Sequence, residues 1–155
     1  VKARPPRFHS RARTPTDGRR ARAEGGVALR LTLKAGERAL VGGAVVRNGS
    51  TRTELFIEND TPVLRESDVL RPEAVRTPCE RIYLTLQLMY VDDHAPGWYA
   101  DAYHELTEQV SLAAPSCAPL LHAIDEQLNA GQLFRALRSA RRLIEHEREL
   151  LSHAS

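Results

Sequence analysis

The chain has 155 residues and a formal net charge of +2 at pH 7, and its hydrophobic content of 42% suffices for the cores of one or two small domains. No apolar run approaches the roughly eighteen residues of a membrane helix, and no apolar signal segment follows the basic N-terminus, so we expect a cytoplasmic protein with no membrane partner. Two cysteines, Cys79 and Cys117, are too few for a disulfide framework and are expected to be free and buried.

Residues 1–26 differ from the rest of the chain in charge. They contain eight basic and two acidic residues, whereas the remainder contains fourteen basic and eighteen acidic residues. Proline and glycine are frequent there and hydrophobic periodicity is absent, so the segment is predicted to be a disordered basic tail. An RNA-contacting arm is one interpretation. We favour the other, a translation start assigned too far upstream, because Val27 opens the first predicted strand.

Residues 27–71 are predicted to form a small antiparallel β-module of five strands. In the first strand three leucines alternate with polar residues, as expected when one face is buried and the other is exposed. The alternating residues are Leu29, Leu31 and Leu33 against Arg30, Thr32 and Lys34. Further strands are expected at 37–41, 44–47, 51–58 and 62–65.

Turn signals separate these strands. Gly42-Gly43 and Asn48-Gly49 are both typical of two-residue hairpin turns, since such turns need a positive φ angle. Pro62 donates no backbone hydrogen bond, so the last strand is predicted to lie at an edge of the sheet.

Residues 72–155 are predicted to be helical, which makes the fold class α+β. Thr77, Pro78 and Glu80 have the spacing of an N-terminal capping box. Four helices are expected, at 78–92, 98–113, 117–128 and 132–151. The first is apolar almost all round, so it is either the central helix of this half or a subunit interface.

No motif indicates catalysis or a cofactor. Cys79 lies in the first turn of a helix, where the dipole lowers a thiol pKa, but no histidine is linked to it by any motif, and a packed structural cysteine is the better interpretation. Residues 92–94 with His104 and Glu105 match no strong metal-ligand spacing. We predict a non-enzyme without a metal site.

A basic patch on a sheet edge is one candidate for function. Arg30, Thr32 and Lys34 share one face of the first strand, and Arg65 ends the last strand. If these strands are neighbours, the patch suits single-stranded RNA. The alternative is a solvated surface without a ligand. It is the more frequent case, because polar outer faces are common in sheets of this kind. The four arginines of the last helix (135, 138, 141 and 142) are expected to form an ion-paired face with the glutamates that follow them.

Protein binding is the other candidate. Three aromatic residues, Trp98, Tyr99 and Tyr103, begin the second helix. With the apolar helix 78–92 they could form a groove for a partner helix. Ordinary helix packing explains them at least equally well.

Several segments of the chain resemble the FlbT family of flagellar regulators. They are residues 29–38, 43–49, 52–59, 62–66, 81–83, 87–90, 131–132 and 142–147. The resemblance extends from residue 28 to about residue 151. It implies a regulator that binds the 5′ untranslated region of flagellin mRNA, represses translation and promotes decay of the message. It also implies that the protein acts together with flagellin and FlaF. In some relatives the regulator activates flagellin synthesis and does not repress it.

A weaker resemblance links the β-module to the carbon storage regulator (CsrA) family of RNA-binding dimers. It rests on residues 31–34, 36–37 and 62–66. It implies a homodimer in which the first strand of one subunit lies beside the last strand of the other, with RNA bound there. The implied RNA-binding residues are Arg30, Thr32, Lys34, Arg65 and Glu66. Leu33 stands where that family has a basic residue, which shifts the expected contact toward Lys34, Arg65 and Arg30.

Two hypotheses follow from the sequence. In the first, the protein binds flagellin mRNA through the β-module. In the second, it is a chaperone-like adaptor that binds flagellin through Trp98, Tyr99 and Tyr103 and acts on the mRNA indirectly.

Overall fold

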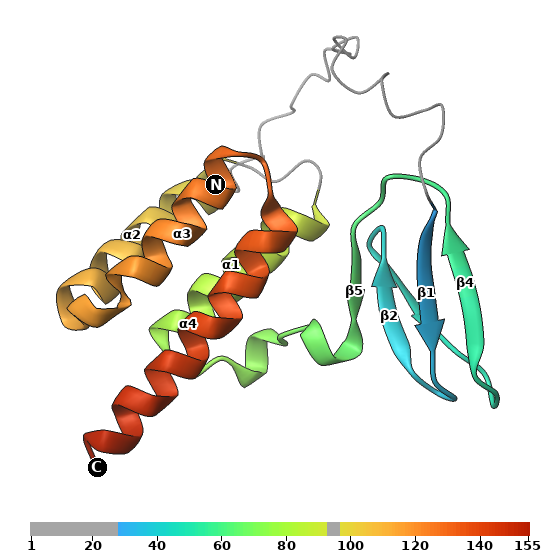
Figure 1. The fold of residues 1–155 in the computed structure, drawn as a ribbon, viewed down its shortest axis with the longest axis horizontal. Coiled ribbons are helices and arrows are strands. Elements are labelled where there is room, and N and C mark those ends of the chain that lie inside the picture. Colours follow the sequence, from blue (N-terminus) through green and yellow to red (C-terminus); the bar gives the residue numbers. More distant parts are fainter. Residues whose placement is uncertain (1–27, 93–96) are drawn as a thin grey trace, which may run out of the picture.

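The computed structural model describes residues 28–92 and 97–155 (Figure 1), so the predicted basic tail (residues 1–26) and His94 lie outside the described residues. Five short antiparallel strands precede four α-helices, which confirms the α+β class. The strands are β1 (Leu29–Leu33), β2 (Arg38–Val41), β3 (Ala44–Arg47), β4 (Thr53–Ile57) and β5 (Val63–Arg65). The helices are α1 (Pro78–Val91), α2 (Trp98–Ala113), α3 (Ala118–Asn129) and α4 (Leu133–His153). Short 3₁₀ turns, η2 (Glu66–Asp68) and η3 (Pro72–Ala74), join β5 to α1.

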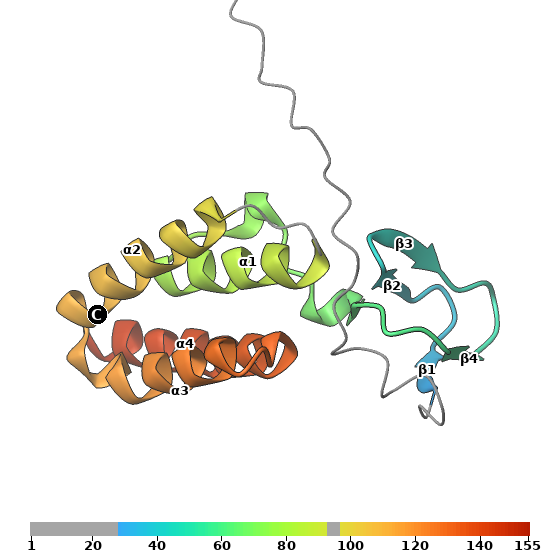
Figure 2. The same cartoon turned by 90° about the horizontal axis from the view of Figure 1, so that it is seen from above.

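The strands form two sheets. One pairs β1 with β4, and the other has the order β3-β2-β5. Figure 2 shows the two sheets as separate layers. A small cluster of buried side chains, Leu31, Leu33, Ala39 and Val63, joins them. Leu31 and Leu33 lie on the buried face of β1, which confirms the two-residue alternation there. Leu29, expected on the same face, is 50% exposed, because the buried cluster does not extend to the first residue of β1.

One of the two predicted hairpins is present. Gly42 and Gly43, with φ angles of 56° and 86°, connect β2 to β3. The hairpin predicted at Asn48-Gly49 is wrong, since β3 and β4 belong to different sheets. The Asn48 side chain instead donates hydrogen bonds to three backbone carbonyls, those of Leu33 (3.1 Å), Lys34 (2.8 Å) and Thr51 (2.8 Å). These bonds hold the chain where it crosses from one sheet to the other.

The helical half (residues 72–155) packs around α1. The predicted capping box is confirmed: the Glu80 amide donates to Thr77 Oγ1, and the Thr77 amide donates to a Glu80 carboxylate oxygen, both at 3.2 Å. Ile82 and Leu86 of α1 are fully buried in a core that also includes side chains of α2, α3 and α4. The central-helix interpretation of α1 is therefore the correct one. Leu151, near the end of α4, is 53% exposed, because the end of α4 projects beyond the other helices (Figure 1).

β5 connects the β-module (residues 28–71) to the helical half. Leu64 is buried in the helical core. The Tyr90 hydroxyl accepts a hydrogen bond from the Val63 amide (3.2 Å) and donates one to the Val63 carbonyl (3.4 Å). The last strand is thus fixed to α1 at its edge. Across residues 28–92 and 97–155, no helix has both the length and the apolar character needed to cross a membrane.

Candidate nucleic-acid interface

The outer face of the β1–β4 sheet combines a cation with an exposed aromatic ring. Arg30 lies opposite Phe56, and Thr32 lies opposite Glu54. Arg30 Nε is 3.2 Å from a Glu54 carboxylate oxygen, and the Phe56 side chain is 59% exposed. A flat apolar ring beside a guanidinium is a surface on which a nucleic-acid base can stack. Phe56 is not among the predicted binding residues, although its alternation with Leu55 and Ile57 in the sequence indicates the face opposite to theirs.

The expectation that β1 and β5 are neighbours within one chain is wrong. β1 pairs with β4, whereas β5 pairs with β2 in the other sheet. Both polar backbone groups of Val63 are bonded to Tyr90, so that part of the β5 edge is already occupied. The continuous two-strand RNA platform inferred from the pattern does not exist in this chain.

The ends of the same two strands are nevertheless linked, through Glu37. Its carboxylate accepts a hydrogen bond from the Lys34 amide (2.8 Å) and forms an ion pair with Arg65 Nη1 (3.0 Å). The pKa of Glu37 lies below its ordinary value, first because of the bond from the Lys34 amide and then because of Arg65. Lys34, Arg65 and Glu66 therefore gather at one end of the β-module, while Arg30 and Thr32 lie farther along β1.

Two further arginines occupy this end of the β-module. Arg38 and Arg47 are direct cross-strand partners in the β2–β3 hairpin. They line a depression of about 600 Å³ together with Gly36, Asn48, Gly49, Ser50 and Glu66. Neither arginine has an ion-pair partner within the described part of the chain.

This arrangement favours an anionic ligand. Like charges placed directly opposite each other destabilise a pair of strands. A phosphate group between Arg38 and Arg47 would remove that repulsion. Sequence reasoning missed the pair, although a signal was present: the two residues are equally distant from the Gly42-Gly43 turn, which places them opposite each other in a hairpin.

The predicted partner-binding residues separate into surface and core. Trp98 is 58% exposed, and its ring centroid lies 3.8 Å from that of the half-buried Tyr99. Tyr103 is only 1% exposed, and its hydroxyl donates to Asp125 Oδ1 at 2.6 Å. Burial raises the pKa of Tyr103, and the Asp125 carboxylate raises it further. Tyr103 is thus a core residue and is removed from the partner-binding set.

The two cysteines are free and buried, as the sequence predicts. The helix-dipole effect considered for Cys79 is outweighed, since burial raises the pKa of its thiol and the nearby Glu147 carboxylate raises it further. Such a thiol is a poor nucleophile. Among the described residues, no group of three or more histidine, cysteine or acidic side chains could hold a metal ion.

Comparison with known proteins identifies the family. The family described as Flagellar protein FlbT matches residues 29–151 of this chain. The chain belongs to the FlbT family. Among its relatives is the "Probable flagellum biosynthesis repressor protein FlbT" of Rhodopseudomonas palustris, which is 41% identical over 124 residues, covering 80% of this chain and 98% of the relative.

Other FlbT relatives give the same result. The Bradyrhizobium diazoefficiens "Probable flagellum biosynthesis repressor protein FlbT 1" is 39% identical over 80% of this chain and 85% of its own length. The FlbT of Caulobacter vibrioides is 37% identical, over 82% of this chain and 92% of its own length. No solved structure matches the chain. The weaker resemblance to the carbon storage regulator family is not confirmed by these comparisons.

Proposed function

We propose that this protein is a cytoplasmic regulator of flagellin synthesis. It binds the 5′ untranslated region of flagellin mRNA, represses translation and promotes decay of the message. Its relatives are named flagellum biosynthesis repressors, which supports the regulatory part of the proposal. The observation that favours RNA is the opposed pair Arg38 and Arg47, neither of which forms an ion pair within the described residues.

The geometry suggests how an unpaired RNA strand would bind. Phosphates lie against Arg38, Arg47 and the exposed Lys34 at the end of the β-module. A base stacks on Phe56 beside Arg30, on the outer face of the β1–β4 sheet. Recognition is by positioning and requires no covalent chemistry.

Supporting residues hold these contacts in place. Glu37 fixes the turn after β1 by binding the Lys34 amide, and it keeps Arg65 close. Asn48 anchors the end of β3 beside Arg47 through its three carbonyl bonds. In this account Arg65 acts mainly as a partner of Glu37, and Glu66 borders the depression.

We extend the proposal to a homodimer. Among the described strands, β1 has a hydrogen-bonded neighbour on one side only. An unpaired strand edge is a ready site for pairing with a second copy of the same chain. Because Tyr90 occupies the backbone of Val63, the β1 edge is more available than the β5 edge. A dimer formed there would present two RNA sites.

The second candidate function is a flagellin-binding adaptor that affects the mRNA indirectly. The observation that favours it is the exposed apolar surface of α2, where Trp98 is 58% and Leu112 is 80% exposed. Flagellin or FlaF would bind there. A pull-down with purified flagellin, repeated after RNase treatment, distinguishes this candidate: flagellin retained by a protein that binds no RNA would favour the adaptor.

The test of RNA binding uses the full chain and a flagellin leader RNA at two salt concentrations. The variant Arg38→Ala/Arg47→Ala should bind more weakly, and its salt slope should fall by about 1.4, since each phosphate contact on a single strand contributes about 0.7. The matched control is Arg71→Ala/Arg81→Ala, which also removes two exposed arginines. Wild-type affinity in the Arg38/Arg47 variant would reject the assigned site.

A further inference from the structure

A second group of arginines lies on the helical half, far along the chain from the first. Arg135, Arg138 and Arg142 follow one another at helical spacing on α4, and all three are exposed. With a helical rise of 1.5 Å per residue they extend over roughly 10 Å. We call these three residues the α4 arginine stripe.

The ion pairs expected between these arginines and the glutamates that follow them are absent among the described residues, so that expectation is wrong. Arg141 pairs with Asp68 (3.2 Å) and Arg148 pairs with Glu80 (3.7 Å). Glu147, expected to neutralise the arginines, instead accepts a hydrogen bond from the Cys79 amide. Within residues 28–92 and 97–155, the α4 arginine stripe has no ion-pair partner. Its charge is available to a ligand.

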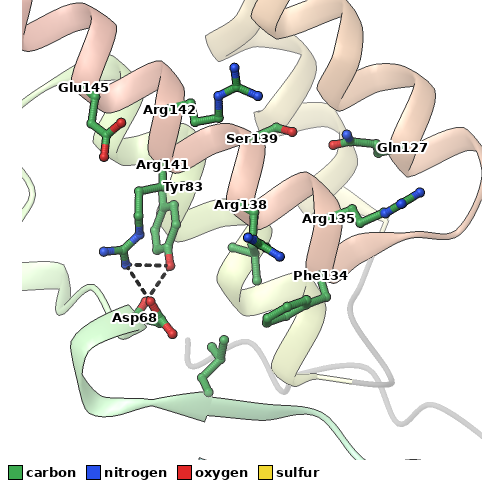
Figure 3. A pocket seen from close by; sticks show the side chains of 12 residues that line it. Asp68, Tyr83, Gln127, Phe134, Arg135, Arg138, Ser139, Arg141, Arg142 and Glu145 are labelled. Atoms are coloured by element: carbon green, nitrogen blue, oxygen red, sulfur yellow. Dashed lines mark hydrogen bonds and ion pairs between the residues drawn. The ribbon is translucent and has the colours of Figure 1, made fainter.

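The stripe lines a pocket of about 590 Å³ between α4 and the end of the β-module (Figure 3). Leu64 and Asp68 contribute from the β-module side, and Tyr83 contributes from α1. Figure 3 shows Arg138 and Phe134 extending from α4 on the side of Asp68, with Gln127 on the neighbouring helix. The pocket is thus bounded by elements from both halves of the molecule.

The charges in this pocket do not balance. Four arginines line it, and only two carboxylates, Asp68 and Glu145, oppose them. Asp68 is already paired with Arg141, whose guanidinium also donates to the Tyr83 hydroxyl at 3.3 Å. An anionic group is therefore the ligand that the pocket lacks.

Two other features of the pocket indicate what kind of anion fits. The Phe134 ring is 45% exposed, and the Tyr90 ring lies beside it, with ring centroids 5.8 Å apart. Gln127 Oε1 is a buried acceptor with no hydrogen-bond donor. A ribonucleotide offers a phosphate for the arginines, a base face for Phe134, and amino or hydroxyl donors for Gln127.

We propose that this pocket binds a segment of single-stranded RNA, as a second contact surface on the helical half. The inference rests on the proposed function and deepens it, because it assigns a further region of the same RNA to α4. Phosphates lie along the α4 arginine stripe, and one base stacks on Phe134. The mRNA is then held by both halves of the protein.

Two variants test the two kinds of contact separately. Arg138→Gln/Arg142→Gln should weaken binding of a flagellin leader RNA and lower the salt slope by about 1.4. Phe134→Ala should weaken binding about tenfold, through lost stacking, while leaving the salt slope unchanged. Arg71→Gln/Arg81→Gln is the matched control, and every variant keeps residues 1–27, so their contribution cancels. Ultraviolet crosslinking of the complex should label a peptide that contains Phe134.

The outcomes separate this inference from the function on which it rests. If the α4 variants bind RNA like the wild type while the Arg38/Arg47 variant does not, the second surface is rejected and the RNA-binding function stands. If the wild-type protein binds no RNA, both are rejected. If polyglutamate competes for the pocket and Phe134→Ala has no effect, the stripe is a general anion surface, and the inference is likewise overturned.

Discussion

The β-module and the helical half differ in how their buried side chains and their cations are arranged. The β-module has a cluster of four buried hydrophobic residues, whereas the core of the helical half has fifteen, one of which is Leu64 of β5. Each half pairs two of its arginines with carboxylates, but the β-module places its unpaired Arg38 and Arg47 directly opposite each other, whereas the unpaired arginines of α4 follow one another along the helix. This difference indicates that the helices supply most of the stability, and that the β-module gives up stability to present charge.

The largest expected effect comes from truncating matched leucines in the two cores. Leu86→Ala should lower the free energy of unfolding by about 2–5 kcal/mol, because the residue is fully buried among the helices. The helical circular dichroism signal should have a higher urea midpoint in Leu33→Ala than in Leu86→Ala. The reason is that the small β cluster around Leu33 can close up around the missing side chain more easily than the larger helical core. RNA affinity should fall more in Leu33→Ala than in Leu86→Ala. Equal helical midpoints in both variants would mean that the two halves unfold as one unit.

The fold could be predicted where the deciding interactions are local. The leucine alternation in β1, the Gly42-Gly43 turn and the capping box at Thr77 each depend on residues close together in sequence. Strand pairing is not local. Asn48-Gly49 has the composition of a hairpin turn, but the Asn48 side chain bonds to the carbonyls of Leu33, the last residue of β1, and of Lys34, which are fifteen and fourteen residues away. No local pattern reveals that competition.

The candidate site was predicted in part. Lys34, Arg65 and Glu66 do lie at one end of the β-module, but through Glu37 rather than through pairing of the first and last strands. Tyr103 could not be separated from Trp98 by sequence, because both are aromatic residues in the first turns of α2 and only packing buries one of them. Arg38 and Arg47 could have been found, since the glycine turn fixes which residues face each other across the hairpin.

A smaller effect of opposite sign is expected at the arginine pair. Arg47→Thr removes a like-charge repulsion, so it should raise the free energy of unfolding by about 0.2–1 kcal/mol while weakening RNA binding. Threonine has a high β propensity, so the substitution does not itself weaken the strand. Urea unfolding and RNA titration on the same preparation measure both quantities. Lower stability together with weaker binding would show that Arg47 is structural.

The smallest expected effect is a change in stability with pH that comes from Glu37 alone. Its pKa is lowered in the folded protein, so the ionised form stabilises the fold above the ordinary pKa of 4.5, and that contribution is lost as the pH falls through the lower folded value. Glu37→Gln lacks the titrating group. The difference in urea midpoint between wild type and Glu37→Gln should therefore be present at neutral pH and shrink below pH 4.5. All other carboxylates are common to both proteins, so they cancel in this difference. A difference that stays constant with pH would mean that the Glu37 carboxylate does not hold Lys34 and Arg65 together by its charge.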